Sequence, residues 1–177
     1  MEVSFHAGYS SMSLTLQLAT THDVADIVSL RNATSAHLTA QYGAGPWSSG
    51  STEKGVLFAM KTAKIYIARD SANRPIAMLA LSTKKPWAID RKYFSPSKRP
   101  LYLTAMAVAP DEQGKGIGQL CMEEACRIAR EWPSDALCLD AYDAEAGAGE
   151  FYRKCGFTEV GRTVYRNCPL IYFEMLL

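Results

Sequence analysis

The chain has 177 residues, of which 48% are hydrophobic and 21% are charged, and its formal net charge is +1. This length suits one compact domain, and this composition is typical of globular proteins, so disorder of the whole chain is excluded. A near-neutral chain lacks the excess of basic residues that nucleic-acid binding needs. The longest apolar run, residues 75–81, is too short to cross a membrane. We therefore expect neither nucleic acid nor a membrane as a partner.

The cysteines are odd in number and scattered, with no CxxC pair and no nearby histidine partner. They are Cys121, Cys126, Cys138, Cys155 and Cys168. This pattern argues against a disulfide framework and a zinc site, and it predicts reduced thiols, no metal and a cytoplasmic location. The N-terminus does not resemble a signal peptide. We expect a disordered leader over residues 1–13, with Met1 or Met12 as the natural start, and a single domain over residues 14–177.

The first half of the chain is predicted to contain a half-buried strand, two helices and a β-hairpin. Their expected ranges are residues 14–18, 20–36, 52–60, 64–68 and 75–81. Thr20 and Asp23 form a capping-box pattern at the start of the first helix. The basic, proline-containing segment 84–100 then predicts a long exposed connection.

The second half is predicted to alternate strands and helices before a final pair of strands. The expected ranges are a strand at 101–109, a helix from Gly114–Gly118 to Pro133, a strand at 136–142, a short helix at 147–155, and strands at 157–166 and 169–176. This order predicts a mixed sheet with helices on both faces. The apolar segment 170–177 is a candidate for pairing across a homodimer.

The most informative segment lies between the 101–109 strand and the helix that follows it. Its sequence, Gln113-Gly-Lys-Gly-Ile-Gly118, places three glycines at alternate positions. Glycines allow close approach of the backbone to a ligand, and the free amides of a helix start attract an anion such as a diphosphate. The spacing does not match a phosphate-binding P-loop, and GxGxG departs from the dinucleotide-binding GxGxxG. Asp140 lies near the spacing of a ribose-binding acid, so an oxidoreductase remains a competitor, as does a glycine turn without a ligand.

Three segments together resemble the GNAT superfamily of N-acetyltransferases. Gln113–Gly118 is similar to its Q/RxxGxG/A motif, Met106-Ala-Val-Ala-Pro110 to the strand before it, and Ala148-Gly-Glu-Phe-Tyr-Arg-Lys-Cys-Gly-Phe157 to its FY-containing segment. The resemblance covers about residues 105–157. It implies an α/β (α+β) fold with a mixed, mostly antiparallel central sheet of about seven strands, flanked by about four helices.

The resemblance also implies that acetyl-CoA is the co-substrate and indicates which residues hold it. Backbone groups of Met106, Ala107 and Val108 are expected to bind the pantetheine arm. The amides expected to bind the pyrophosphate are those of Gln113, Gly114, Lys115, Gly116, Ile117 and Gly118. Glu145 stands where the family usually has an asparagine that contacts pantetheine, which puts that contact in doubt.

Tyr152 stands where the family has the acid that protonates the departing thiolate, and we expect it to be the catalytic residue. Alternation along the 101–109 strand predicts that Tyr102, Thr104, Met106 and Val108 share one face. None of them is acidic, so the base is not identified. The remaining candidates are Asp140, Tyr142 and Glu145 acting through water, and a mechanism without a dedicated base, in which a strand amide (that of Val108) polarises the carbonyl.

The resemblance implies acetyl transfer to a primary amine of a small molecule or a peptide, by direct attack in a ternary complex. An alternative is a non-catalytic module that binds or senses acyl-CoA. Loop aromatics are candidates for lining an acceptor pocket, anchoring the loops or contacting a second subunit. They are Tyr42, Trp47, Trp87, Tyr93 and Phe94.

Overall fold

The computed structural model describes residues 14–177, so the expected leader over residues 1–13 lies outside the described residues. The main elements, in chain order, are β1 (Gln17–Leu18), α1 (Val24–Tyr42), α2 (Glu53–Ala59), β2 (Lys64–Arg69), β3 (Pro75–Ser82), β4 (Pro100–Val108), α3 (Ile117–Glu131), β5 (Ala136–Tyr142), α4 (Gly149–Lys154), β6 (Thr158–Tyr165) and β7 (Cys168–Leu176). Within residues 14–177, no helix combines the length and apolar character that a bilayer crossing requires.

The strands form one mixed sheet in the order β1-β2-β3-β4-β5-β7-β6. All neighbouring strands are antiparallel except β4 and β5, which are parallel and joined by α3. The predicted seven-stranded, mostly antiparallel sheet with four α-helices is therefore confirmed for the part of the chain described here.

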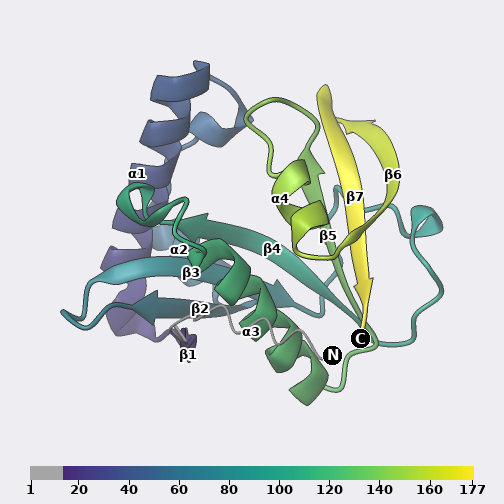
Figure 1. Ribbon diagram of the computed structural model, residues 1–177, viewed down its shortest axis with the longest axis horizontal. Coiled ribbons are helices and arrows are strands. Elements are labelled where there is room, and N and C mark those ends of the chain that lie inside the picture. Colours follow the sequence, from purple (N-terminus) through teal and green to yellow (C-terminus); the bar gives the residue numbers. More distant parts are fainter. Residues whose placement is uncertain (1–13) are drawn as a thin grey trace, which may run out of the picture.

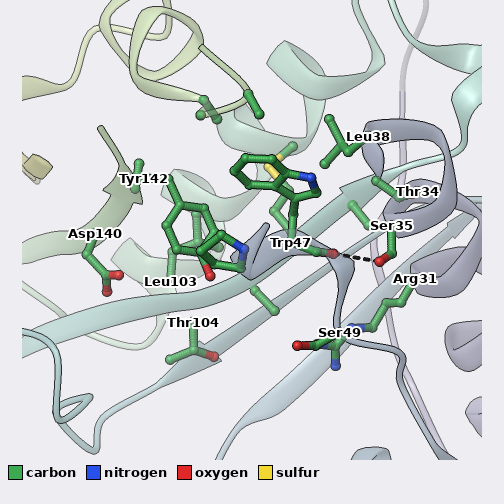
Figure 2. Close-up of a pocket in the computed structure, with 18 of the residues that line it drawn as sticks. Arg31, Thr34, Ser35, Leu38, Trp47, Ser49, Leu103, Thr104, Asp140 and Tyr142 are labelled. Carbon is green, nitrogen blue, oxygen red and sulfur yellow. Dashed lines mark hydrogen bonds between the residues drawn. The ribbon is translucent and has the colours of Figure 1, made fainter. Parts of the chain in front are cut away.

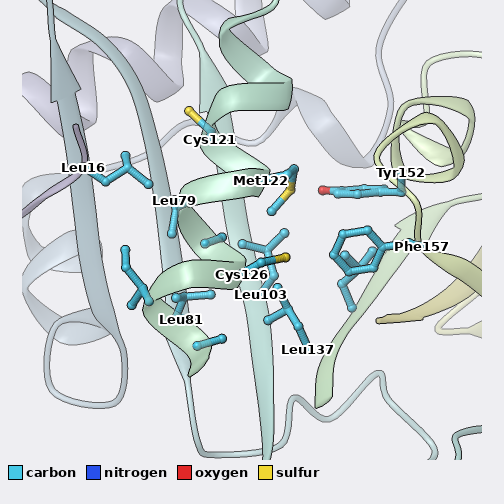
Figure 3. Close-up of a cluster of buried hydrophobic side chains, with 14 of the residues drawn as sticks. Leu16, Leu79, Leu81, Leu103, Cys121, Met122, Cys126, Leu137, Tyr152 and Phe157 are labelled. Carbon is cyan, nitrogen blue, oxygen red and sulfur yellow. The ribbon is translucent and has the colours of Figure 1, made fainter. Parts of the chain in front are cut away.

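Helices cover both faces of the sheet (Figure 1). On one face, α1 and α2 bury Ile27 and Val56 against β2 and β3. On the other face, α3 packs its apolar side, including Cys121 and Ala125, on Leu79 and neighbouring strand residues (Figure 3). Because alternate residues of β3 point to opposite faces, its nearly continuous apolar sequence supplies both cores.

The first helix starts as predicted but ends later. The Thr20 amide donates to Asp23 Oδ2 at 2.8 Å, which confirms the capping box. The expected end near Ala36 is wrong, because α1 continues to Tyr42 and stops at Gly43, where φ is +81°. The expected strand 14–18 is also shorter, since only Gln17 and Leu18 pair with β2 before the capped turn begins.

The connection between β3 and β4 is less exposed than predicted. Two residues of this connection, Ile89 and Phe94, are buried against Tyr172 and neighbouring residues of β4 and β5. The Tyr172 hydroxyl donates to the Ala88 carbonyl and accepts from the Asp90 amide at 3.2 Å. The expectation of a fully exposed segment 84–100 is therefore wrong, because this segment covers the part of the sheet that the helices leave open.

A β-bulge in β4 changes the direction of its side chains. Ala80 pairs with Ala105 but Leu81 pairs with Leu103, so Thr104 is an extra residue without a partner in the register. Consequently Met106 and Val108 pack on the α3 side, whereas Tyr102 packs on the opposite face. The prediction that Tyr102, Thr104, Met106 and Val108 share one face is wrong, because one inserted residue inverts the alternation.

The C-terminal strand lies inside the sheet. β7 pairs with β5 on one side and with β6 on the other, so both of its edges are occupied. The expectation that residues 170–177 pair across a homodimer is therefore wrong. The free sheet edges of the described chain are those of β1 and β6.

Tyr172→Phe is expected to lower the free energy of unfolding by about 1–3 kcal/mol, because it leaves the Ala88 carbonyl and the Asp90 amide without their partner. Urea unfolding measures the change. Tyr165→Phe on β6 is the matched control, since its hydroxyl has no hydrogen-bond partner within residues 14–177. Equal midpoints for the two variants would contradict the prediction.

Candidate active site

The sheet opens between β4 and β5. These parallel strands pair only over Pro100–Tyr102 and Ala136–Cys138. Beyond Tyr102 and Cys138 they have no pairing with each other, and Figure 1 shows them diverging toward α4 and the loop before it. Backbone groups that face this opening have lost their strand partner, so they are available to a ligand.

One cavity, of about 450 Å³, lies where the opening meets the starts of α3 and α4. Its lining comes from α1, the second half of β4, the glycine turn and α4. The lining residues are Thr34, Met106, Ala107, Val108, Gln113, Gly114, Gly116, Gly118, Gln119, Ala148, Phe151, Tyr152, Lys154 and Cys155. Its volume lies in the range of ~300–1,000 Å³ that is usual for small-molecule sites.

The glycine turn is shaped to leave its amides exposed. Gly114 and Gly116 have φ values of +75° and +84°, and a Cβ on either would meet no atom within 4 Å. The first bond of α3 runs from the Leu120 amide to the Gly116 carbonyl at 3.1 Å. The preceding amides of Ile117 and Gly118 thus have no partner inside the helix, and with the positive end of the helix dipole they attract an anion.

The glycine turn and α1 both approach β4 at the Val108 carbonyl. The Gln113 Nε2 donates to this oxygen at 3.1 Å. The Thr34 hydroxyl lies 3.3 Å from it and 3.0 Å from the Leu30 carbonyl of its own helix. The Val108 carbonyl is thus engaged within the protein, which leaves the amide of Val108 for the predicted ligand contact. Sequence reasoning missed Thr34, since it comes from a helix far from the motif.

The structure brings most of the predicted cofactor residues together, but not all of them. Lys115 lies on the rim, where its Nζ pairs with Glu112 at 3.2 Å. Ile117 is buried in the core, so only its backbone can serve a ligand. Glu145 is exposed and lines a different hollow, on the far side of the loop before α4.

A second cavity, of about 400 Å³, lies between α1, the loop after it, and the open ends of β4 and β5 (Figure 2). Its lining residues are Arg31, Thr34, Ser35, Leu38, Pro46, Trp47, Ser49, Ser51, Leu103, Thr104, Ala105, Met106, Ala107, Asp140, Ala141, Tyr142, Ala146, Gly147, Ala148 and Tyr152. Trp47 meets Tyr142 edge to face, with ring centroids 6.2 Å apart.

Of the predicted loop aromatics, only Trp47 lines this second cavity. Tyr93 and Phe94, in the connection between β3 and β4, instead pack on the ring of Tyr172. Trp87 is 86% exposed on that connection.

The two cavities meet at a shared wall. Thr34, Met106, Ala107, Ala148 and Tyr152 line both of them. Tyr152 is 8% exposed, and burial raises the pKa of its phenol well above the usual value, with a further contribution from the negative charge of Asp140. Tyr152 therefore keeps its proton at neutral pH and presents it at the junction.

Asp140 projects from β5 into the second cavity (Figure 2). No side chain within residues 14–177 forms an ion pair with it, and burial raises the pKa of its carboxyl above the ordinary value. The sequence offered Asp140 only as a weak candidate, because it stands in an apolar strand and its surroundings come from three other segments. A carboxylate of raised pKa in a cavity is a suitable proton acceptor.

The thiols are held in their protonated form. All five cysteines are free, and burial raises the pKa of Cys121 to about 12 and that of Cys138 to about 11. Cys155, which lines the first cavity, also has a raised pKa because of burial. No cluster of three or more His, Cys, Asp or Glu side chains that could hold a metal ion occurs within residues 14–177.

Comparison with known proteins decides the family. The model of the acetyltransferase (GNAT) family matches residues 31–157, which include the second part of α1, the bulged strand β4, the glycine turn and α4. The chain belongs to the GNAT family. The family match excludes the oxidoreductase alternative, and it implies the use of acetyl-CoA.

The chain is also similar to a named relative and to solved structures of the same fold. Streptothricin acetyltransferase from Streptomyces lavendulae is 35% identical over 68 residues, which are 38% of this chain and 36% of that protein. The match thus spans about a third of that relative. AAC(6')-Ib, solved with acetyl-CoA, has a TM-score of 0.72 at 19% identity, with 93% of each chain covered. Spermidine N-acetyltransferase from Vibrio cholerae, solved with CoA and spermine, has a TM-score of 0.68 at 18% identity, with 93% of this chain and 95% of that chain covered.

Gly116→Asp is expected to weaken acetyl-CoA binding by at least about tenfold relative to Gly116→Asn, because like charges brought together cost several kcal/mol. Asn has nearly the same shape as Asp, and both residues tolerate the left-handed conformation that Gly116 adopts at φ +84°. The pair therefore isolates the charge from backbone strain. Calorimetric titration with acetyl-CoA measures the affinities, and equal values would place the diphosphate away from this turn.

Proposed function

We propose that the protein is an acetyl-CoA-dependent N-acetyltransferase that acts on a primary amine of a small molecule or a peptide. The observation that carries this proposal is the shared wall between the two cavities. One cavity offers the free amides of the α3 start, and the other contains a carboxylate that lacks an ion-pair partner within the described chain. Two substrates bound in these cavities would meet at Tyr152.

The first cavity fits acetyl-CoA by its shape and its donors. Gly114 and Gly116 leave open space beside the amides of the turn, which suits the diphosphate. Met106–Val108 of β4 pair with β3 but have no strand partner on the β5 side, which suits an extended amide-containing arm that can replace the missing strand. The backbones of Gln113, Lys115, Ile117 and Gly118 complete the proposed diphosphate site. Bound acetyl-CoA would supply an acetyl group activated as a thioester.

Asp140 is the proposed general base. The amine must lose a proton as its nitrogen bonds to the acetyl carbon, and the Asp140 carboxylate is the acidic group in the lining of the second cavity. Because burial raises its pKa, the Asp140 carboxylate is a stronger base than the carboxylate of an exposed aspartate, which suits proton removal from an amine. The Val108 amide is the proposed donor to the carbonyl oxygen, since its own carbonyl is already occupied.

Tyr152 is the proposed donor to the departing sulfur. A phenol with a raised pKa is a weaker acid than a thiol, so full proton transfer from Tyr152 to a thiolate is uphill. A hydrogen bond from its hydroxyl stabilises the charge that develops on sulfur as the carbon–sulfur bond breaks. CoA then leaves as a thiolate, while the proton released by the amine is held by Asp140.

Direct attack in a ternary complex suits the adjoining cavities better than an acyl-enzyme. A covalent route needs a thiolate, and burial raises the pKa of Cys155, the thiol that lines the cofactor cavity.

The free state of all five cysteines also supports the cytoplasmic location that the sequence predicts.

Release of free CoA, followed with a thiol reagent across a panel of primary amines, tests the proposed function. Amine-dependent release with a matching acetylated product supports a transferase. Tight binding of acetyl-CoA without turnover on any amine would favour the alternative, a module that senses acyl-CoA.

Tyr152→Phe is expected to lower kcat by about tenfold or more, because the donor to the leaving sulfur is lost while the aromatic packing remains. Acetyl-CoA affinity should stay nearly unchanged. Steady-state kinetics and calorimetry separate the two effects. Tyr66→Phe on β2 is the matched control, as Tyr66 lines neither cavity. An unaltered kcat in Tyr152→Phe would remove this residue from the mechanism.

Asp140→Asn is expected to lower kcat/KM by about 10²–10⁴-fold, the usual contribution of a general base. In the unmodified enzyme, kcat/KM should fall as pH decreases through the raised pKa of Asp140, since the protonated carboxyl accepts no proton. This acidic limb should lie above pH ~4, the ordinary pKa of an exposed aspartate.

The same substitution should also change stability with a defined sign. A raised pKa in the folded state means that the charged carboxylate destabilises the fold above the unfolded-state pKa. Asp140→Asn should therefore raise Tm at pH 7, and the gain should vanish as pH falls below about 4. Asp143→Asn is the control, because Asp143 pairs with Arg162 at 2.8 Å outside both cavities. A lower Tm for Asp140→Asn would mean that the charged Asp140 carboxylate stabilises the folded protein through its neighbours.

A further inference from the structure

The second cavity contains two opposite charges on different elements. Arg31 comes from α1 and Asp140 from β5, and they are the charged residues in its lining. Figure 2 shows Asp140 on one side of the view and Arg31 on the other, with Thr104 between them. They form no salt bridge with each other, although both are partly removed from water.

Arg31 is unusual among the half-buried arginines of residues 14–177, which are Arg31, Arg69 and Arg91. Arg69 binds the carboxylates of Asp23 and Asp26 at 2.7 and 2.6 Å, and Arg91 donates to Ser97 Oγ at 2.7 Å. Arg31 has neither an ion pair nor a hydrogen bond to any described residue, and burial lowers the pKa of its guanidinium. A desolvated charge without a partner is costly unless a ligand supplies the partner.

Neutral donors accompany Arg31. Ser49 and Ser51 line the same cavity, and their hydroxyls have no hydrogen-bond partner within residues 14–177. Their segment is fixed in place, because Asn32 binds both the amide and the carbonyl of Ser51, at 2.7 and 3.2 Å. A guanidinium and two hydroxyls on a fixed frame are suited to a carboxylate.

We infer that the acceptor is a small zwitterion, an amino acid or short peptide whose primary amine faces Asp140 and whose carboxylate binds Arg31. This inference rests on the proposed function, because it names the acceptor class of the same site. The assignment also specifies what the site rejects. An amine with a second positive charge in place of the carboxylate would set that charge against Arg31, which is unfavourable in a partly desolvated cavity.

The test uses matched acceptors that differ only at the carboxylate. L-amino acids and dipeptides are compared with their C-terminal amides and with the corresponding decarboxylated amines, and kcat/KM is measured for each member. For the unmodified protein, we expect the carboxylate form to be preferred by about tenfold or more, the usual effect of a charged hydrogen bond.

Arg31→Gln is expected to remove most of that preference while leaving the amides nearly unaffected. Arg31→Lys, which keeps the charge but loses the planar fork, is expected to retain part of it. Acetyl-CoA affinity of both variants, measured by calorimetry, should match that of the unmodified protein, because Arg31 does not line the cofactor cavity. An unchanged carboxylate preference in Arg31→Gln would overturn the inference.

The outcomes separate this inference from the proposed function. Acetylation of amides and decarboxylated amines as efficient as that of the acids would overturn the zwitterion assignment and leave the transferase intact. If no amine is acetylated, the proposed transferase activity is wrong. Thermal shifts of the CoA-loaded protein then test whether the second cavity binds a zwitterion. A larger rise in Tm with an amino acid than with its amide, lost in Arg31→Gln, supports binding of a zwitterion, and equal rises refute it.

Discussion

The separation of β4 from β5 is the structural constraint on which the site depends. These are the parallel neighbours of an otherwise antiparallel sheet, and their ladder stops after Tyr102 and Cys138. Two physical consequences follow from this one break. Backbone groups of β4 lose a strand partner and are left for a ligand, and a passage opens between the two faces of the sheet. The two cavities share lining residues of β4 and α4 beside this opening.

The bulge at Thr104 adjusts the strand to this opening. Before the bulge, Leu101 and Leu103 pack beneath α3, and after it Met106 and Val108 do so. An uninterrupted strand would have turned Met106 and Val108 toward the other face. The bulge thus keeps the core continuous where the strand bends away from β5, and it leaves Thr104 in the lining of the second cavity. Bulges beside functional sites commonly redirect side chains in this way.

The charges of the site contrast with those elsewhere on the molecule. Arg69, Arg74 and Arg162 each bind two or more carboxylates in local networks. Arg31 and Asp140 stand apart from these networks and are held away from each other by the elements that carry them. Two partly buried charges without an ion-pair partner among residues 14–177 thus lie where substrates are proposed to bind, which is common in sites that bind ligands.

The sequence by itself determined the order of the elements, the glycine turn and the resemblance to the family. Hydrophobic periodicity, the Thr20 capping pattern and the glycines of residues 114–118 are local signals, because the backbone angles and hydrogen bonds they specify involve neighbours along the chain. Only the tertiary structure decided the second cavity, which we propose for the acceptor. Arg31, Ser49, Thr104 and Asp140 come from four separate segments, and Arg31 and Asp140 become partly buried without an ion-pair partner only when those segments pack together. The face of each β4 residue was likewise beyond simple alternation, because the bulge is set by the register with β3 rather than by β4 alone.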